Sequence, residues 1–310
     1  MKLRAMMVVL VWGGLLCPTI AVANEEAAKL FDEGKALLQK ADFEGALKAF
    51  GEAAKADAKN EEYRQQHNML RRVMQIRDRL PEQKDDDRWA AMAGALRGYY
   101  YENGIFQEAL ALDRQAHKRF HNAETATQLA ETHLELGMNA EAVELLSALP
   151  DEDLTPGGRL LLGIGQARLG RVDDARAIAD RFKETADLPG DALFNLACLH
   201  SLLGHQDRAA DLLIRCCELT PPSRLEAFKD SLKKCADLRE LVAAERFAKV
   251  LETKSKVPES KCSSGAGCGK CPNRGGCGAA KPPANAGGKS GESAGQSGGC
   301  PNHPAGGGKP

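Results

Sequence analysis

Gly204-His205-Gln206-Asp207-Arg208-Ala209 combines a turn residue with a small residue five places later, and this six-residue pattern occurs five times in the chain. The other copies are Ala41-Asp42-Phe43-Glu44-Gly45-Ala46, Gly104-Ile105-Phe106-Gln107-Glu108-Ala109, Gly137-Met138-Asn139-Ala140-Glu141-Ala142 and Gly170-Arg171-Val172-Asp173-Asp174-Ala175. The last three copies begin 33 and 34 residues apart. A period near 34 residues, with one helical hairpin in each period, predicts an all-α solenoid of stacked helix pairs.

The residues around the first copy have the sizes that a close helix pair needs. Gly34 and Ala46 are small enough to let two helices approach, whereas Phe43 and Phe50 are large enough to fill the groove between them. These residues resemble the tetratricopeptide repeat consensus, with Ala58 where that family usually has a closing proline. The resemblance implies a scaffold that presents surfaces to partner proteins, and it implies no enzymatic activity.

The resemblance covers about residues 27–251, within a predicted solenoid of residues 24–253. It places repeats at about 27–60, 90–123, 124–157, 156–189 and 190–223, with a capping helix at 225–251. A cap with one polar face is expected because a stack of repeats must end against solvent.

Residues 61–88 depart from the repeat pattern. Their apolar residues lie near helical spacing, so we expect a long helix that Pro81 ends. The charged segment from Glu82 to Arg88 is expected to be a loop. We therefore interpret 61–88 as a degenerate insertion in the stack.

Residues 1–23 have the features of a secretory signal peptide. Lys2 and Arg4 precede an apolar run, and Ala21-Val22-Ala23 supplies small residues before Asn24. We expect cleavage before Asn24 and export to the periplasm or beyond the cell.

Two alternatives exist for this segment. A membrane anchor would have to span about 30 Å of hydrocarbon, but Gly13, Gly14 and Pro18 interrupt the short apolar run. A lipoprotein would be modified at Cys17, but Leu16 stands where lipid attachment requires a small residue. No other stretch could span a bilayer, so no membrane span is expected in the mature chain.

Charge is unevenly distributed along the chain, although the formal net charge is only −1. Residues 1–23 hold two bases, and residues 254–310 hold eight bases and two acids, which leaves 32 bases and 41 acids, or −9, for residues 24–253. An acidic body argues against nucleic acid as a partner, because nucleic-acid binding requires a basic face.

The inner face of the predicted stack is lined by the first helix of each repeat. Residues expected there, as candidates for binding another protein or an extended peptide, are Lys35, Gln39, Tyr101, Glu102, Glu131, Glu135, Arg168, Asn195 and Cys198. The glutamates favour a basic or extended peptide. The alternative is that these residues are ordinary solvated helix faces.

Catalytic motifs are not recognised in this sequence. Gly163-Ile164-Gly165 lies inside a predicted helix and is interpreted as packing, and Gly288-Lys289-Ser290 lacks the leading glycine of a phosphate loop. His133 and His200 occupy large core positions of their first helices, so burial is expected rather than metal ligation.

Four cysteines, Cys198, Cys216, Cys217 and Cys235, fall in the last repeat and the cap. They are expected to be small buried side chains, with a disulfide between two of them as the alternative. Cys216 and Cys217 are neighbours that point apart, and Cys198 and Cys235 belong to different helices, so no thiol cluster comparable to that of the tail is expected in the body.

The last segment, residues 254–310, is rich in cysteine and glycine. From Cys262 onward it has no Leu, Ile, Val, Met or aromatic residue and holds 15 of the 31 glycines, so it is expected to be disordered in isolation. Its candidate metal ligands are Cys262, Cys268, Cys271 and Cys277, spaced C-x5-C-x2-C-x5-C, followed by Cys300 and His303. Four such thiols can close around Zn(II) or Cu(I). Local disulfides or incidental thiols are the alternatives.

The sequence therefore favours a non-catalytic, exported scaffold for protein–protein interaction. The alternative is a metal-handling protein whose cysteine-rich tail carries zinc or copper.

Overall fold

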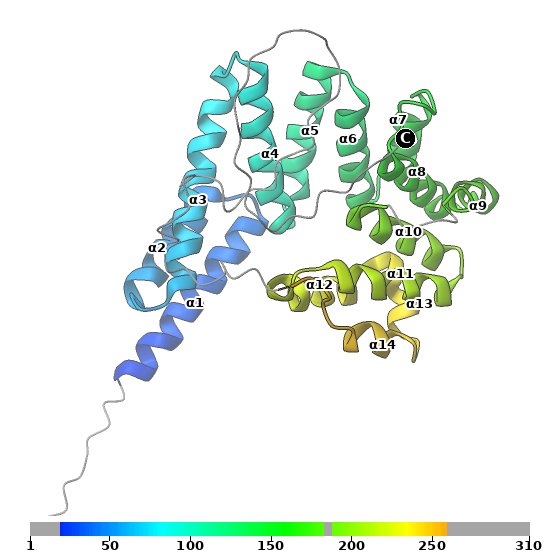
Figure 1. The fold of residues 1–310 in the computed structure, drawn as a ribbon. Helices are drawn as coiled ribbons and strands as arrows, with labels where there is room; N and C mark the ends of the chain where they lie inside the picture. Colours follow the sequence, from blue (N-terminus) through cyan, green and yellow to red (C-terminus); the bar gives the residue numbers. More distant parts are fainter. Residues whose placement is uncertain (1–18, 183–187, 259–310) are drawn as a thin grey trace, which may run out of the picture. The chain divides into compact units, whose positions relative to one another are not determined.

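The computed structural model describes residues 19–182 and 188–258, with side chains from Glu25 onward, and all regular structure in these ranges is helical (Figure 1). The helices are α1 (Thr19–Gln39), α2 (Phe43–Ala56), α3 (Glu61–Arg79), α4 (Asp86–Glu102), α5 (Phe106–Phe120), α6 (Ala123–Glu135), α7 (Asn139–Ser147), α8 (Pro156–Arg168), α9 (Val172–Ala179), α10 (Gly190–Leu202), α11 (Gln206–Leu219), α12 (Pro222–Lys234), α13 (Arg239–Val242) and α14 (Phe247–Glu252). Two 3-10 turns, η1 (Leu80–Glu82) and η2 (Ala236–Leu238), complete the set. None of the described helices is long and apolar enough to cross a membrane.

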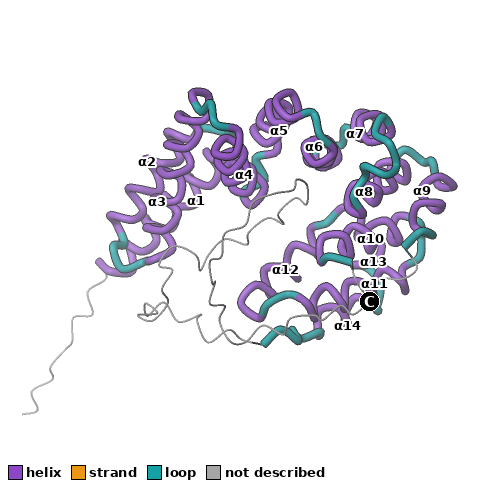
Figure 2. Tube along the Cα trace, turned by 45° about the horizontal axis from the view of Figure 1, so that its top comes forward, coloured by secondary structure: helices purple, strands orange, loops and turns teal. Residues whose placement is uncertain are grey.

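Five helical hairpins form the stack, and each predicted repeat corresponds to one of them (Figure 2). In order, they are α1–α2, α4–α5, α6–α7, α8–α9 and α10–α11. The chain therefore folds as an all-α solenoid of helix pairs, as the spacing of the six-residue pattern predicts.

The turn residue of each pattern is in the left-handed backbone region. The φ angles are 58° at Ala41, 66° at Gly104, 73° at Gly137, 75° at Gly170 and 78° at Gly204. In every copy, the amide of the residue after the turn donates to a carbonyl five residues earlier, which closes the end of the first helix. Four of the five positions are glycine because only glycine adopts this conformation without steric cost.

The small residue of each pattern is fully buried. Ala46, Ala109, Ala142, Ala175 and Ala209 each have 0% of their surface exposed. A small buried side chain at this point lets the second helix of every hairpin pack closely against its neighbours.

The buried apolar residues form two cores. The N-terminal core, in α1–α5, contains Phe31, Phe43, Phe50, Trp89 and Tyr100 among others. The C-terminal core, from Ala130 onward, consists mainly of leucine, alanine and cysteine. The boundary between the cores lies where α5 meets α6.

The region between the first two repeats is more helical than the sequence predicts. The long helix α3 is confirmed, and Pro81 lies in the 3-10 turn that follows it. The predicted loop from Glu82 to Arg88 is wrong in extent, because α4 already begins at Asp86. Asp85 caps this helix by accepting a hydrogen bond of 2.9 Å from the Arg88 amide, so the acidic run starts the helix.

The cap also differs from the single helix expected over 225–251. It consists of α12, η2, α13 and α14, because the backbone becomes extended at Cys235 and ends α12 there. The periodic apolar residues are nevertheless buried: Leu225, Leu232, Leu238, Leu241 and Phe247 are 0–7% exposed. Several short helices thus bury the residues that one long helix was expected to bury.

Both ends of the chain extend beyond the described residues. Helix α1 begins at Thr19, before the predicted cleavage point at Asn24, and residues 1–18 lie outside the described ranges. The tail ligand candidates, from Cys262 to His303, also lie outside them. Signal cleavage and metal binding by the tail therefore stay predictions.

Candidate functional site

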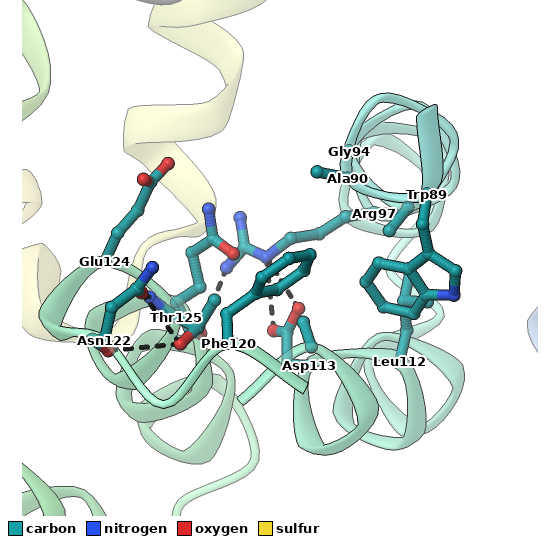
Figure 3. A pocket seen from close by; sticks show the side chains of 13 residues that line it. Trp89, Ala90, Gly94, Arg97, Leu112, Asp113, Phe120, Asn122, Glu124 and Thr125 are labelled. Atoms are coloured by element: carbon teal, nitrogen blue, oxygen red, sulfur yellow. Dashed lines mark hydrogen bonds and ion pairs between the residues drawn. The ribbon is translucent and has the colours of Figure 1, made fainter. Parts of the chain in front are cut away.

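A cavity of about 250 Å³ opens between α4, α5 and α6 (Figure 3). We call it the α4–α6 pocket, and its lining consists of Trp89, Ala90, Ala93, Gly94, Arg97, Leu112, Asp113, Ala116, Phe120, Asn122, Glu124, Thr125 and Gln128. It lies at the boundary between the two cores, and it has one apolar wall and one polar edge.

The apolar wall comes from the start of α4 and the end of α5. The rings of Trp89 and Phe120 meet edge to face with centroids 5.7 Å apart. The Arg119 guanidinium lies 5.2 Å from the centre of the Trp89 ring and is paired with Asp86 at 2.6 Å. These contacts fix both rings, so the wall is formed before any ligand binds.

The polar edge is a buried ion pair between α4 and α5. Arg97 Nε donates to both carboxylate oxygens of Asp113, at 3.0 and 3.1 Å. Arg97 Nη2 also donates to Glu131 Oε2 at 2.7 Å and to the Gln128 carbonyl at 3.2 Å, both on α6. Asp113 is only 1% exposed, so the arginine neutralises a carboxylate that water does not reach.

Hydroxyl groups complete this network. Thr132 Oγ1 donates to Asp113 Oδ2 at 2.5 Å, and Tyr101 Oη lies 2.5 Å from Thr132 Oγ1. The Tyr101 ring lies under the Arg97 guanidinium, 4.2 Å from the ring centre. The network therefore joins three consecutive helices through polar contacts at the point where the apolar core is interrupted.

Burial is the largest single influence on the pKa of each of these groups. It raises the pKa of Asp113, although Arg97 and Thr132 oppose the change. It also raises the pKa of Tyr101, with a further contribution from Glu131, so the phenol stays protonated. Burial alone would lower the pKa of Arg97, but Glu131, Tyr101 and Asp113 outweigh it and the pKa is raised. The arginine accordingly stays charged and holds the pocket edge in place.

The Arg97–Asp113 pair replaces an apolar pair that the other repeats keep. Counting from each turn residue, the equivalent pairs are Gly34 with Phe50, Ala130 with Leu146, Gly163 with Ala179 and Ala197 with Leu213. Gly94 likewise stands where the other repeats have Phe31, Thr127, Leu160 and Phe194. Repeat two thus lacks the side chains that close this space elsewhere in the stack.

None of the residues predicted for the inner face lines the α4–α6 pocket, although two of them lie in the polar network at its edge. Tyr101 and Glu131, both predicted for the inner face, belong to the network. Arg97 and Asp113 were not predicted, because both depart from the repeat pattern. A search for departures from the pattern at equivalent positions would have found both.

The other predicted inner-face residues are dispersed. Exposed Lys35 is paired with Asp32 at 2.7 Å, and Gln39 donates from Nε2 to the Asn103 carbonyl. Glu102 is exposed and Asn195 is half-buried. None of these four contributes to the α4–α6 pocket.

Arg168 belongs to a second polar cluster, at the cap. It donates from Nε and Nη2 to the two oxygens of Asp237, at 2.9 and 2.7 Å, and from Nη1 to the Leu134 carbonyl at 2.7 Å. Glu135 lies nearby, and its pKa is raised by burial, with Arg168 opposing and Glu131 and Asp237 adding to the effect.

The body contains a group of two thiols and one carboxylate that the sequence did not predict. Cys198 Sγ on α10 lies 4.0 Å from Cys235 Sγ at the end of α12, and both lie within 4.8 Å of an oxygen of Asp237. The extended backbone at Cys235 ends α12, and the two cysteines that approach each other there are 37 positions apart. All four described cysteines are free thiols, and Cys216 and Cys217 are buried apart from this cluster.

The two core histidines differ. His133 is buried, as predicted, and neither of its ring nitrogens has a hydrogen-bond partner. His200 is only half-buried, and its Nδ1 lies 3.2 Å from His205 Nδ1. Burial, with the charges of His205 and Arg208, lowers the pKa of His200 to about 4.

Comparison with known proteins identifies one of the repeats. A family model described as tetratricopeptide repeat matches residues 190–222, which form the hairpin α10–α11. No curated protein matches the chain. Among solved structures, a tetratricopeptide repeat protein from Parabacteroides merdae ATCC 43184 is 16% identical over 74% of this chain and 81% of its own, with a TM-score of 0.35. The fifth hairpin is therefore similar to a tetratricopeptide repeat, and the other four share its left-handed turn and its buried alanine.

Proposed function

We propose that this protein is a non-catalytic tetratricopeptide scaffold that holds an extended segment of a partner protein in the α4–α6 pocket. The observation that carries this proposal is the Arg97–Asp113 pair, which replaces the apolar pair of the other repeats. Exchanging a buried ion pair for apolar residues is often neutral or stabilising. A requirement for stability therefore does not explain why repeat two has this ion pair, whereas a requirement for an open pocket does.

The lining of the pocket indicates what the partner segment contains. Trp89, Leu112 and Phe120 offer an apolar surface that suits a leucine-sized or aromatic side chain. Glu124 lies on the opposite edge, and Arg97 is already neutralised by two carboxylates. The residues around the pocket and the −9 charge of residues 24–253 favour lysine or arginine next to the apolar anchor.

Gly94 provides a sharp test because its missing side chain leaves the pocket open. A Cβ atom at Gly94 or at Gly98 would have no other atom within 4 Å, and both glycines lie on the exposed face of α4. Only Gly94 lines the pocket. Gly94→Leu should fill the pocket without disturbing the core, and Gly98→Leu is the matched control on the same helix.

The experiment is a selection of displayed random peptides on the full chain, followed by binding measurements on the parent and the two variants. We expect selected peptides to share an apolar residue flanked by bases, with binding lost in Gly94→Leu and kept in Gly98→Leu. Selected peptides that bind all three proteins equally would place the binding site elsewhere and contradict the proposal.

Export and metal handling are further proposals. The pattern of residues 1–23 supports cleavage before Asn24 and export, which N-terminal sequencing of protein recovered outside the cytoplasm would test. The C-x5-C-x2-C-x5-C spacing from Cys262 to Cys277 supports a metal-handling role for the tail as the second candidate function. Replacing the tail cysteines by serine should then remove the zinc or copper that the tail holds, as measured by titration under reducing conditions.

A further inference from the structure

Cys198, Cys235 and Asp237 form a cluster that the proposed scaffold function does not use. Their sulfur and oxygen atoms all lie within 4.8 Å of one another, and they come from α10, the end of α12 and η2. Cys198 is 2% exposed, whereas Cys235 is half-buried, so the cluster is sheltered but is open on the side of Cys235.

The distance between the two sulfur atoms excludes a disulfide in this structure and fits either two free thiols in contact or two metal-bound thiolates. A disulfide bond is about 2.05 Å long. Two thiolates bound tetrahedrally to one zinc ion at about 2.3 Å lie about 3.8 Å apart. The observed 4.0 Å is close to the metal-bound separation and about twice the disulfide bond length.

The surroundings supply the support and the charge that such a site needs. Arg168 holds both oxygens of Asp237, at 2.9 and 2.7 Å, which orients the carboxylate as hydrogen-bond partners of metal ligands commonly do. Two thiolates and one carboxylate carry three negative charges. A divalent cation together with the Arg168 guanidinium balances these three charges, and Glu135 adds a carboxyl group beside Arg168.

We propose that Cys198, Cys235 and Asp237 bind one zinc(II) ion, with the fourth position left to water. Binding replaces the thiol protons: each Cys gives up one proton to solvent, and each sulfur then donates an electron pair to the metal. No oxidant or reductant is needed. This inference is independent of the proposed peptide binding.

A zinc ion here would tie the cap to the preceding repeats. It would bond directly to α10 and to the segment Cys235–Asp237, and Arg168 connects the cluster to α8 and to the Leu134 carbonyl of α6. Because metal binding to the folded state stabilises that state, the C-terminal part of the stack should become more stable in zinc.

The test uses the full chain with Cys262, Cys268, Cys271, Cys277 and Cys300 replaced by serine, so that the tail thiols do not compete. This parent is titrated with cobalt(II) under reducing conditions, and zinc(II) then displaces the cobalt. The variants are Cys198→Ala, Cys235→Ala and Arg168→Gln. Cys216→Ala is the matched control, because Cys216 is equally buried and lies outside the cluster.

We expect the parent to bind one equivalent of cobalt with a thiolate-to-metal absorption band, and zinc to remove the band and raise the melting temperature. Cys198→Ala and Cys235→Ala should lose both effects, and Cys216→Ala should keep them. Arg168→Gln should weaken zinc binding by roughly 10–100-fold, because it removes the residue that orients Asp237. Circular dichroism of the metal-free variants verifies that they are folded.

Three results would overturn the proposal. One is a folded parent that binds no cobalt or zinc when reduced. Another is zinc binding by Cys198→Ala and Cys235→Ala that equals that of the parent. The third is a thiol count on unreduced protein that shows Cys198 and Cys235 joined in a disulfide, together with no zinc binding after reduction.

Discussion

Repeats one and two have the same helical hairpin, but they carry opposite kinds of side chain at one pair of equivalent positions. In repeat one, Gly34 on α1 faces Phe50 on α2, and a Cβ on Gly34 would lie 2.5 Å from the Phe50 ring carbons. In repeat two, Arg97 and Asp113 occupy these positions and a cavity remains beside them. The first pair closes the helix interface with apolar atoms, whereas the second keeps it open with an ion pair.

The difference shows how a repeat protein can acquire a site without changing its fold. The left-handed turn and the buried alanine, which fix the hairpin, are present in both repeats. Other positions of the two helices, such as Arg97 and Asp113 in repeat two, can then vary. Departures from the repeat pattern, rather than matches to it, therefore indicate where function lies.

The largest effect should follow from breaking one half of the ion pair. Asp113→Leu restores the apolar residue that repeats three and five have, but it removes one of the two carboxylates that pair with the partly buried Arg97. We expect a loss of about 3 kcal/mol in the free energy of unfolding, because removing one partner of a buried ion pair is costly. Denaturant titration of the parent and the variant measures this loss.

The double variant Arg97→Ala with Asp113→Leu tests whether repeat two can carry the apolar pair of its neighbours. It recreates the pair Ala130–Leu146, so its stability should return to within about 1 kcal/mol of the parent. Binding of selected peptides should be lost at the same time. A double variant as unstable as Asp113→Leu would mean that repeat two cannot accommodate the apolar pair of its neighbours.

A smaller loss is expected from adding one methyl group to repeat one. Gly34→Ala places a Cβ against the fully buried Phe50 ring, and overpacking costs about 1–3 kcal/mol. Better helix propensity offsets about 1 kcal/mol of that cost. The control is Gly98→Ala on α4, which meets open space and should stabilise the protein by about 0.5–1 kcal/mol. Thermal melting that moves in the same direction for both variants would contradict the close contact.

Repeats two and five differ at the position four residues before the turn, where repeat two has Tyr100 and repeat five has His200. His200 has a pKa of about 4 because of burial and the nearby His205 and Arg208, with Asp180 opposing them. An unfolded histidine titrates near pH 6.5. Between about pH 6.5 and pH 4, the unfolded chain therefore binds a proton that the folded chain does not bind. Stability contributed by neutral His200 is therefore complete above about pH 6.5 and falls as the pH decreases toward 4.

We expect this contribution to be about 1 kcal/mol between about pH 7 and pH 5, since the ring is only half-buried. His200→Tyr, which introduces the residue of repeat two, should lose less stability over the same interval than the parent. Denaturant midpoints measured at both pH values give the difference. Parallel pH dependence in the two proteins would show that His200 is not the group that titrates.

The sequence was sufficient for the hairpins and insufficient for both polar clusters. The turn residues and the small residues are local, repeated features, so every hairpin could be placed from them. The cap was predicted as one helix because periodicity does not reveal that Cys235 has an extended backbone. Cys198, Cys235 and Asp237 come together where α12 ends, and sequence spacing gives no measure of such a contact.

The pocket lining was not predicted, but two residues of the neighbouring polar network were. Tyr101 and Glu131 followed from the expected orientation of first helices. Arg97 and Asp113 did not, because each looks like an ordinary charged residue on a helix until it is aligned with Gly34 and Phe50. The physical reason is that burial of a charged pair depends on the neighbouring helix, which a single segment does not contain.

The smallest predicted effect concerns the turns of the two repeats. Ala41 has φ 58° in repeat one, where repeat two has Gly104 with φ 66°. The left-handed conformation costs a residue with a Cβ about 1–2 kcal/mol, whereas glycine pays about 0.5–1 kcal/mol in extra chain entropy. Ala41→Gly should therefore stabilise the protein by about 0.5–1 kcal/mol, and Gly104→Ala should destabilise it by a similar amount. Denaturant midpoints of both variants, and of the double exchange, measure the effect. The double exchange should be nearly neutral, because the same cost moves from the first turn to the second. A loss of stability in Ala41→Gly would mean that the Ala41 methyl group makes contacts worth more than the strain of its backbone.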